Sequence, residues 1–295
     1  MKSNKRLLVT LLSGILATAA NGSILVKESA TGYTPDTTIV GQNPTTTGFS
    51  GAWTNPNNFG LAASVDFYPR STGLSYTGFG SATGGSLEHF RVSGTAATKQ
   101  VERPISFTPA TVSGSDVLYI GFLFQHSATS GNDVDATVTY GLLGSSRDNN
   151  FILDGGSLSI GLAGSNGSTL NLGAVAQDTT HMVLLRVSDN TTGGGGNDAF
   201  YDNVEAWLNP DLSNLGTANA SGVGIISKFN GSNTDISADG LSLLGVLAAG
   251  ESFTMDEFFV ATDLANVTVP EPSTWALLAG VSALGLVMLR RRCRD

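Results

Sequence analysis

Val117-Leu118-Tyr119-Ile120-Gly121-Phe122-Leu123-Phe124 lies near the middle of this chain. Successive side chains of a β-strand point to opposite faces of the sheet, and here both the odd-numbered and the even-numbered positions are predominantly apolar. A strand with this pattern is buried on both sides, so we expect it to run through the centre of a sheet.

Short runs on either side of this strand are separated by clusters of Gly, Asn, Asp, Ser and Pro, which is the pattern of an all-β sandwich. The expected strands are 61–68, 88–92, 101–107, 117–125, 137–143, 151–153, 158–162, 181–187, 199–208, 222–229, 241–247 and 252–260. A short helix could follow Asn209-Pro210-Asp211. No linker or shift in composition divides the body, so we expect one β-sandwich over residues 20–266.

The composition agrees with a β-rich body. Of the 295 residues, 41% are hydrophobic, so the chain can bury a sizeable core. Only 13% are charged, against about 25% in an average soluble domain, and this scarcity of Glu, Lys and Arg disfavours a helical bundle. The formal charge of −9 argues against nucleic acid as a partner. The single cysteine, Cys293, leaves the body without disulfides.

The N-terminus has the three parts of a secretory signal peptide. Basic residues precede an apolar stretch over 7–16, and the small residues Ala17 and Ala19 follow it. The alternative, an anchoring helix, is disfavoured because the apolar stretch is too short to span a membrane. We therefore predict a signal peptide over residues 1–19, cleaved after Ala19.

The C-terminus, residues 267–295, contains a second targeting segment of a different kind. The triplet Pro270-Glu271-Pro272 is followed by an apolar run over 275–289 and then by Arg290, Arg291 and Arg292. As a helix this run would be about 22 Å long, and arginines at its end can extend its reach across the membrane. We predict a single transmembrane helix in the inner membrane, with the arginines cytoplasmic and the body outside.

This order of triplet, helix and arginine cluster resembles the PEP-CTERM sorting signal. In that family the tail is recognised and cut near the triplet by exosortase, a membrane-embedded cysteine peptidase of Gram-negative bacteria that make exopolysaccharide. The resemblance implies that Pro270, Glu271, Pro272 and the cluster Arg290, Arg291 and Arg292 serve processing and sorting by another enzyme. It also implies an exported protein that is anchored in the membrane before processing and is afterwards at the cell surface or extracellular.

The body resembles the laminin-G-like, concanavalin-A-like jelly rolls. The stretches that carry this resemblance are 48–53, 117–125, 181–187, 204–210 and 253–260. This superfamily includes lectins, glucanases and adhesive modules, so the fold alone does not select a function.

No catalytic residue can be assigned from the sequence. Glucanases of this superfamily carry alternating acids, Glu-x-Asp-x-x-Glu, on one strand, and this chain has no such run. The adjacent pair Asp256-Glu257 would point to opposite sides of a strand, so we expect one carboxylate in solvent and the other at an edge or loop. His89, His126 and His181 are isolated in or beside strands, and we interpret them as strand or edge histidines.

Two kinds of binding residue remain. Loop acids and amides suit calcium, for which we single out Asp133 and Asp135, although these types are also common turn formers. The other clusters of this kind are Asp148-Asn149-Asn150, Asp198 and Asp202-Asn203. Aromatic side chains could stack on sugar rings or fill the core; the candidates are Trp53, Tyr76, Phe79, Tyr201 and Trp207.

The sequence is therefore compatible with three functions. The first is a non-enzymatic, exported cell-surface or extracellular-matrix protein. The second is a lectin-like module that binds a neutral polysaccharide, with calcium as its one conceivable cofactor. The third, a glycan hydrolase or lyase, is the weakest because no carboxylate constellation supports it.

Overall fold

The computed structural model describes residues 24–55, 65–79, 84–91, 97–106, 117–128, 134–141, 150–161, 169–188, 203–223 and 240–266. In these ranges the chain forms strands, turns and one 3-10 turn, η2 (Leu264–Asn266). The strands are β1 (Ile24–Glu28), β2 (Val65–Arg70), β3 (Ser86–Arg91), β4 (Ala97–Pro104), β5 (Leu118–Ser127), β6 (Asp135–Gly141), β7 (Asn150–Asp154), β8 (Ser157–Gly161), β9 (Thr169–Ala174), β10 (His181–Ser188), β11 (Asn203–Leu208), β12 (Ala220–Val223), β13 (Gly240–Leu247) and β14 (Ser252–Ala261).

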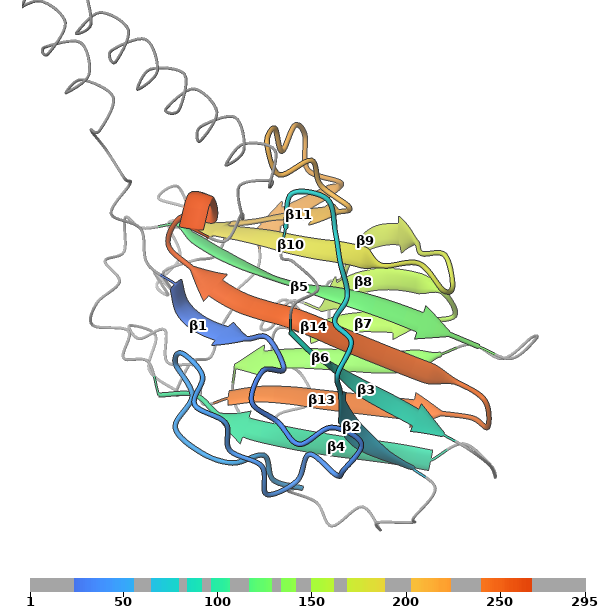
Figure 1. Ribbon diagram of the computed structural model, residues 1–295. Coiled ribbons are helices and arrows are strands. Elements are labelled where there is room, and N and C mark those ends of the chain that lie inside the picture. The colour runs from blue at the N-terminus through green and yellow to red at the C-terminus, as the bar shows by residue number, and fades with distance from the viewer. Residues whose placement is uncertain are drawn as a thin grey trace, which may run out of the picture.

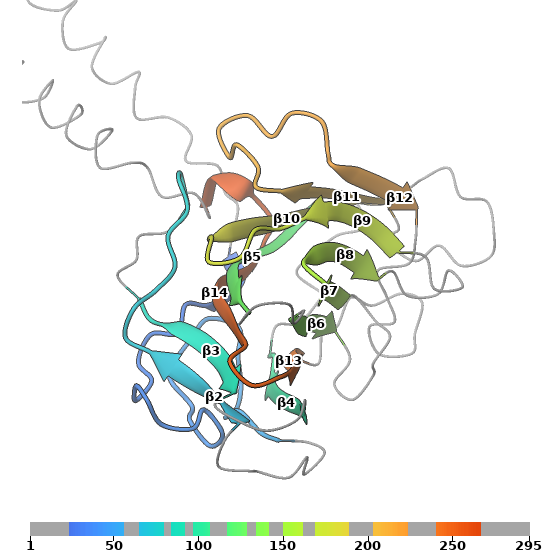
Figure 2. The same cartoon turned by 90° about the vertical axis from the view of Figure 1, so that its right-hand side faces the viewer.

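The described strands form two antiparallel sheets that pack face to face (Figure 1). The large sheet has the order β12-β11-β10-β5-β14-β3-β2, with β1 paired to β14, and the small sheet has the order β4-β13-β6-β7-β8-β9. Figure 2 shows them as two separate layers. The prediction of an all-β sandwich is confirmed.

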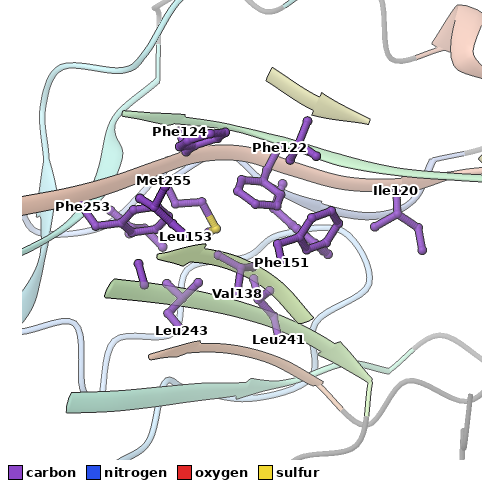
Figure 3. Close-up of a cluster of buried hydrophobic side chains, with 14 of the residues drawn as sticks. Ile120, Phe122, Phe124, Val138, Phe151, Leu153, Leu241, Leu243, Phe253 and Met255 are labelled. Carbon is purple, nitrogen blue, oxygen red and sulfur yellow. The ribbon is translucent and has the colours of Figure 1, made fainter. Parts of the chain in front are cut away.

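The core lies between the two sheets (Figure 3). Phe122 of β5 meets Phe151 of β7 edge to face, with 4.8 Å between the ring centroids. Aliphatic side chains of β6 and β13, including Val138 and Leu241, fill the same layer and are buried. Burial of these side chains is the main favourable contribution to folding.

β5 is buried on both faces, as its sequence predicts. It lies between β10 and β14, and its even-numbered side chains enter the core. Leu123 points to the outer face of the large sheet, which is the face turned away from the small sheet, and belongs there to a second apolar cluster. A Cβ at Gly121 would lie 3.0 Å from the Phe259 ring and 2.6 Å from the carbonyl oxygen of Val183, so this position requires glycine.

Three sequence expectations differ from the structure. β1 and β9 are absent from the expected strands; β9 is an edge strand in which three of the six residues are exposed and only Leu172 is buried. The short helix expected after Asp211 is wrong. Asp211 instead closes a turn, because its carboxylate accepts the Ser213 N–H at 2.9 Å and its carbonyl accepts the Asn214 N–H at 3.0 Å.

The segment 24–55 covers the edges of both sheets on one side. At β2, the carbonyl of Phe67 accepts the Ile39 N–H at 2.9 Å, and at β4 the carbonyl of Glu102 accepts the Thr54 N–H at 2.7 Å. Covered edges cannot pair with strands of other molecules. The N-terminal segment therefore closes the sandwich on this side.

The two predicted targeting segments, 1–19 and 267–295, lie outside the described residues. Ala17, Ala19, the triplet and the arginine cluster belong to them. Among the helices of the described ranges, none has the length and apolar character needed to cross a membrane.

Candidate ligand-binding site

A row of polar side chains crosses the outer face of the large sheet. Glu88 of β3 is paired in register with Thr254 of β14, which in turn is opposite Gln125 of β5. On the other side, Glu88 is opposite Tyr68 of β2. Residues directly opposite on neighbouring strands share a face, so the pairing brings together side chains that are far apart in the sequence.

Glu88, Thr254 and Gln125 of this row line a cavity of about 470 Å³. Asp36 and Thr180 contribute from two other loops, and residues 71–75, the segment directly after β2, form a wall. Hydroxyl groups dominate the lining; they belong to Ser71, Thr72, Ser75, Ser86, Thr180 and Thr254. The cavity therefore offers many hydrogen-bonding groups.

Arg70, the last residue of β2, organises the charges of the cavity. Its Nε donates to the carboxylate of Glu88 and its Nη1 donates to the carboxylate of Asp36. Its guanidinium also lies 5.6 Å from the centre of the Tyr68 ring. One arginine thus holds two carboxylates of the cavity lining in defined positions.

The strap, residues 71–79, crosses the outer face and is drawn in cyan in Figure 1, in front of β14 and β5. Its Leu74 and Phe79 join the second apolar cluster, and the Phe79 ring lies 5.3 Å from that of Phe259. The Tyr76 hydroxyl donates to the carbonyl of Pro210 at 2.9 Å. Apolar packing and this hydrogen bond hold the strap against the sheet.

Asp256 fixes the strap at its other end. Its Oδ2 accepts the Leu74 N–H at 2.8 Å and its Oδ1 accepts the Glu257 N–H at 2.7 Å. The side chain is buried, and this desolvation raises the pKa of Asp256 to about 8 against the opposing effect of the Leu74 N–H. A Cβ at Gly73 would lie 2.8 Å from the same Oδ2, so only glycine lets the strap approach this closely.

The expectation that one of Asp256 and Glu257 points into solvent is wrong, because both are buried. The pairing of β14 with β5 shifts register between Asp256 and Phe259, and Glu257 has a φ of +52°. Such a bulge breaks the regular alternation of faces. Glu257 forms an ion pair with Lys27 of β1 at 3.0 Å.

The predicted stacking aromatics do not gather at the cavity. Trp53, Phe79 and Trp207 are buried. Tyr76 is half-buried in the strap, and its own hydroxyl makes the contact with Pro210. Tyr201 lies outside the described residues. The core interpretation therefore holds for the three buried rings.

The three histidines are interior residues and do not line the cavity. His89 stacks on Phe67 with 4.2 Å between centroids. His181 lies with its Nε2 2.9 Å from the carbonyl oxygen of Ala176 and its Nδ1 3.0 Å from the side-chain nitrogen Nδ2 of Asn209. Burial lowers the pKa of His126.

The predicted calcium residues are only partly described. Asp133 lies outside the described residues, whereas Asp135 is exposed at the start of β6 and borders, with Asp154, a smaller hollow of about 170 Å³. Within the described part of the chain, no three His, Cys, Asp or Glu side chains are grouped so that they could hold a metal ion. Of the other clusters, Asn150 is buried in β7 and Asn203 donates to the Ser188 hydroxyl at 3.1 Å, while Asp148, Asn149, Asp198 and Asp202 are not described.

Sequence reasoning missed Arg70, Glu88 and the strap as parts of one site. The expected strand 61–68 stopped short of Arg70, and Glu88 was recognised only as a strand residue. Asp36 lies in irregular chain, where no periodicity indicates the direction of a side chain. The sequence signal that could have found the site is the outward position of Tyr68 and Arg70, two residues apart on one strand.

Comparison with known proteins identifies the C-terminal tail. Residues 268–292 match the family described as the PEP-CTERM protein-sorting motif. No curated protein matches the chain. Similar solved structures include the globular domain of T. cruzi calreticulin (11% identity, TM-score 0.45, covering 91% of this chain and 99% of that one). Another is an endo-β-1,4-glucuronan lyase from the fungus Trichoderma reesei (12% identity, TM-score 0.44, covering 83% and 98%).

These structural likenesses are too distant to bear on function. The tail is more informative, because its motif implies exosortase-dependent sorting. The chain thus combines an all-β sandwich with a C-terminal motif that indicates an exported protein, anchored at its C-terminus before processing.

Proposed function

We propose that this chain is a non-enzymatic cell-surface or extracellular-matrix protein that reaches its destination through a signal peptide and an exosortase-type peptidase. The observation that carries the proposal is the match of residues 268–292 to the sorting motif. In this proposal the helix over 275–289 holds the protein in the inner membrane until processing. The sandwich, a laminin-G-like or concanavalin-A-like jelly roll over residues 20–266, is the part that is displayed.

The proposed absence of catalysis is supported by the geometry of the cavity. Retaining glycosidases need a nucleophilic carboxylate and an acid/base carboxyl about 5 to 5.5 Å apart. The carboxylates of Asp36 and Glu88 both accept hydrogen bonds from Arg70. Neither is therefore an unpaired carboxyl group that could serve as the acid/base. Asp256 is buried behind the strap and does not line the cavity. A glycan hydrolase or lyase is therefore the weakest candidate, and an assay for released reducing ends tests it.

Cell fractionation tests the sorting proposal. Replacing Pro270, Glu271 and Pro272 together by alanine should block processing, so the chain should accumulate in the inner membrane at its full unprocessed mass. Deleting residues 267–295 should instead release the body from the membrane. Mass spectrometry of the mature protein should find Ala20 at the N-terminus and a C-terminus near the triplet. An unprocessed chain in the cytoplasm would contradict the proposal.

A lectin-like module that binds a neutral polysaccharide is the second candidate, favoured by the polar cavity on the outer face of the large sheet. A glycan array probed with the protein tests this function. Calcium dependence through Asp133 and Asp135 belongs to the same candidate, and repeating the array with a chelator tests it. Binding that survives the chelator would remove calcium from the proposal and leave the cavity as its basis.

A further inference from the structure

We propose that the cavity bordered by Arg70, Glu88 and Thr254 binds a neutral sugar through its hydroxyl groups. The inference deepens the lectin-like candidate and rests on it. The volume of the cavity, about 470 Å³, is within the usual range of ligand pockets, about 300–1,000 Å³. Its hydroxyl-rich lining matches a ligand that presents hydroxyls in several directions.

The two carboxylates that Arg70 holds supply fixed acceptors. A carboxylate has about four lone-pair sites, so Asp36 and Glu88 can each accept further hydrogen bonds while bound to Arg70. Because Arg70 holds both, little side-chain freedom is lost when a ligand binds. Neighbouring hydroxyls of a sugar ring can donate to such acceptors, and the hydroxyls of the lining can donate or accept in turn.

The charge of the site selects a neutral ligand over an anionic one. Two carboxylates against one guanidinium leave the cavity lining negative, in a chain whose formal charge is also negative. A uronic acid or a phosphate would meet repulsion here. The charge balance therefore opposes an acidic polysaccharide as the ligand.

Asp256 acts as a positioning residue for this site. It does not line the cavity, but its carboxyl group holds the strap at Leu74. The strap residues 71–75 form the wall, and the carbonyl of Thr72 accepts the Ser86 hydroxyl at 2.8 Å. The shape of the cavity thus depends on how the strap is held.

The test measures binding calorimetrically with the full-length chain, purified in a detergent that has no sugar headgroup. The probes are glucose, galactose, mannose, xylose, cellobiose and lactose, with glucuronic acid as the charged relative. At least one neutral probe should bind with a dissociation constant below about 10 mM, and glucuronic acid should bind more weakly than glucose.

Two variants locate the site. Arg70→Gln should weaken binding by about tenfold or more, because a charged group that orders both carboxylates is lost. Thr254→Val keeps the β-branched shape on β14 but removes one hydroxyl, and should weaken binding by about threefold to tenfold. Because this change is nearly isosteric, it remains informative if Arg70→Gln does not fold.

Arg186→Gln is the matched control. Arg186 lies on the same face of the large sheet, opposite Tyr119, and is paired with Glu205 at 2.9 Å, but it does not line the cavity. The affinity of the Arg186→Gln variant for the neutral sugar should stay within about twofold of that of the parent.

Three results would overturn the proposal: no neutral probe binds, glucuronic acid binds more tightly than glucose, or Thr254→Val binds as tightly as the parent. The sorting proposal does not depend on any of these results, since fractionation and terminal mass spectrometry measure it separately.

Discussion

Arg103 and Arg70 make the same kind of interaction in two different environments. Each lies in a strand whose edge is covered by the segment 24–55, Arg103 in β4 and Arg70 in β2, and each pairs with a carboxylate of that segment. The Arg103 and Glu28 side chains are each 1% exposed. The Arg70 side chain is 30% exposed and its partner Asp36 is 71% exposed.

The buried arginine is satisfied on every side. Besides its bond to Glu28, it donates to the Tyr33 hydroxyl at 2.9 Å, to the carbonyl of Gly51 at 3.0 Å and to the carbonyl of Pro44 at 2.6 Å. Trp53 Nε1 donates to the same Tyr33 hydroxyl at 2.6 Å. Burial raises the pKa of Glu28, and the hydrogen bond from Tyr33 opposes this shift. The network fixes the N-terminal segment, so its role is structural.

The difference shows that burial, more than the type of ion pair, decides the role of each arginine. A buried charge that loses its partner is strongly destabilising, whereas an exposed pair contributes little to stability. The network around Arg103 therefore holds the fold together. The pairs of Arg70 matter little for stability but keep charged groups in place beside a cavity.

The largest expected effect comes from breaking the buried network. Arg103→Met should destabilise the protein by about 3–5 kcal/mol, because Glu28 is left charged and unpaired in the interior. Urea unfolding, followed by tryptophan fluorescence, measures the change. Combining Arg103→Met with Glu28→Gln should recover part of the loss, since the unpaired charge is then removed. A loss below about 1 kcal/mol in the single variant would mean that the network is not essential.

A smaller effect should come from titration of Asp256 beneath the strap. Its pKa in the folded state, about 8, is raised above the ordinary aspartate pKa of 3.8, so between these values the folded state binds one more proton than the unfolded state. Stability from this group is therefore fully present below about pH 4 and is lost as the pH rises toward about 8. The slope is at most about 1.4 kcal/mol per pH unit.

Asp256→Asn removes this titration, and urea unfolding at pH 5, 7 and 9 measures the change in slope. Relative to the parent, the free energy of unfolding of the variant should be lowest at low pH and should rise as the pH rises. One oxygen of asparagine can still accept the Leu74 N–H, but its NH₂ group cannot accept the Glu257 N–H. A constant difference between variant and parent over this range would rule out Asp256 as the titrating group.

The sequence predicts what depends on local periodicity. β5 could be recognised as a central strand because its eight-residue pattern is apolar on both faces, and the two-sheet body follows from many similar runs. The role of Arg103 could not be recognised, because Glu28 and Tyr33 reach it from a segment 75 and 70 residues away in sequence. Asp256 and Glu257 were placed wrongly because alternation assumes a regular strand, and the bulge breaks it. The cavity depends on cross-strand register, which no single stretch of sequence contains.

The smallest expected effect on stability is that of Arg70→Gln. Both of its ion pairs are partly exposed, so the change should cost no more than about 1 kcal/mol of unfolding free energy. Arg186→Gln, which breaks another partly exposed pair on the same sheet, should give a similarly small loss. Salt should reduce the difference between parent and variant further, because exposed charges are screened. If Arg70→Gln instead lowered the free energy of unfolding as much as Arg103→Met does, Arg70 would be a second residue that holds the segment 24–55 in place. Its position beside the cavity would then be explained by stability, without a ligand.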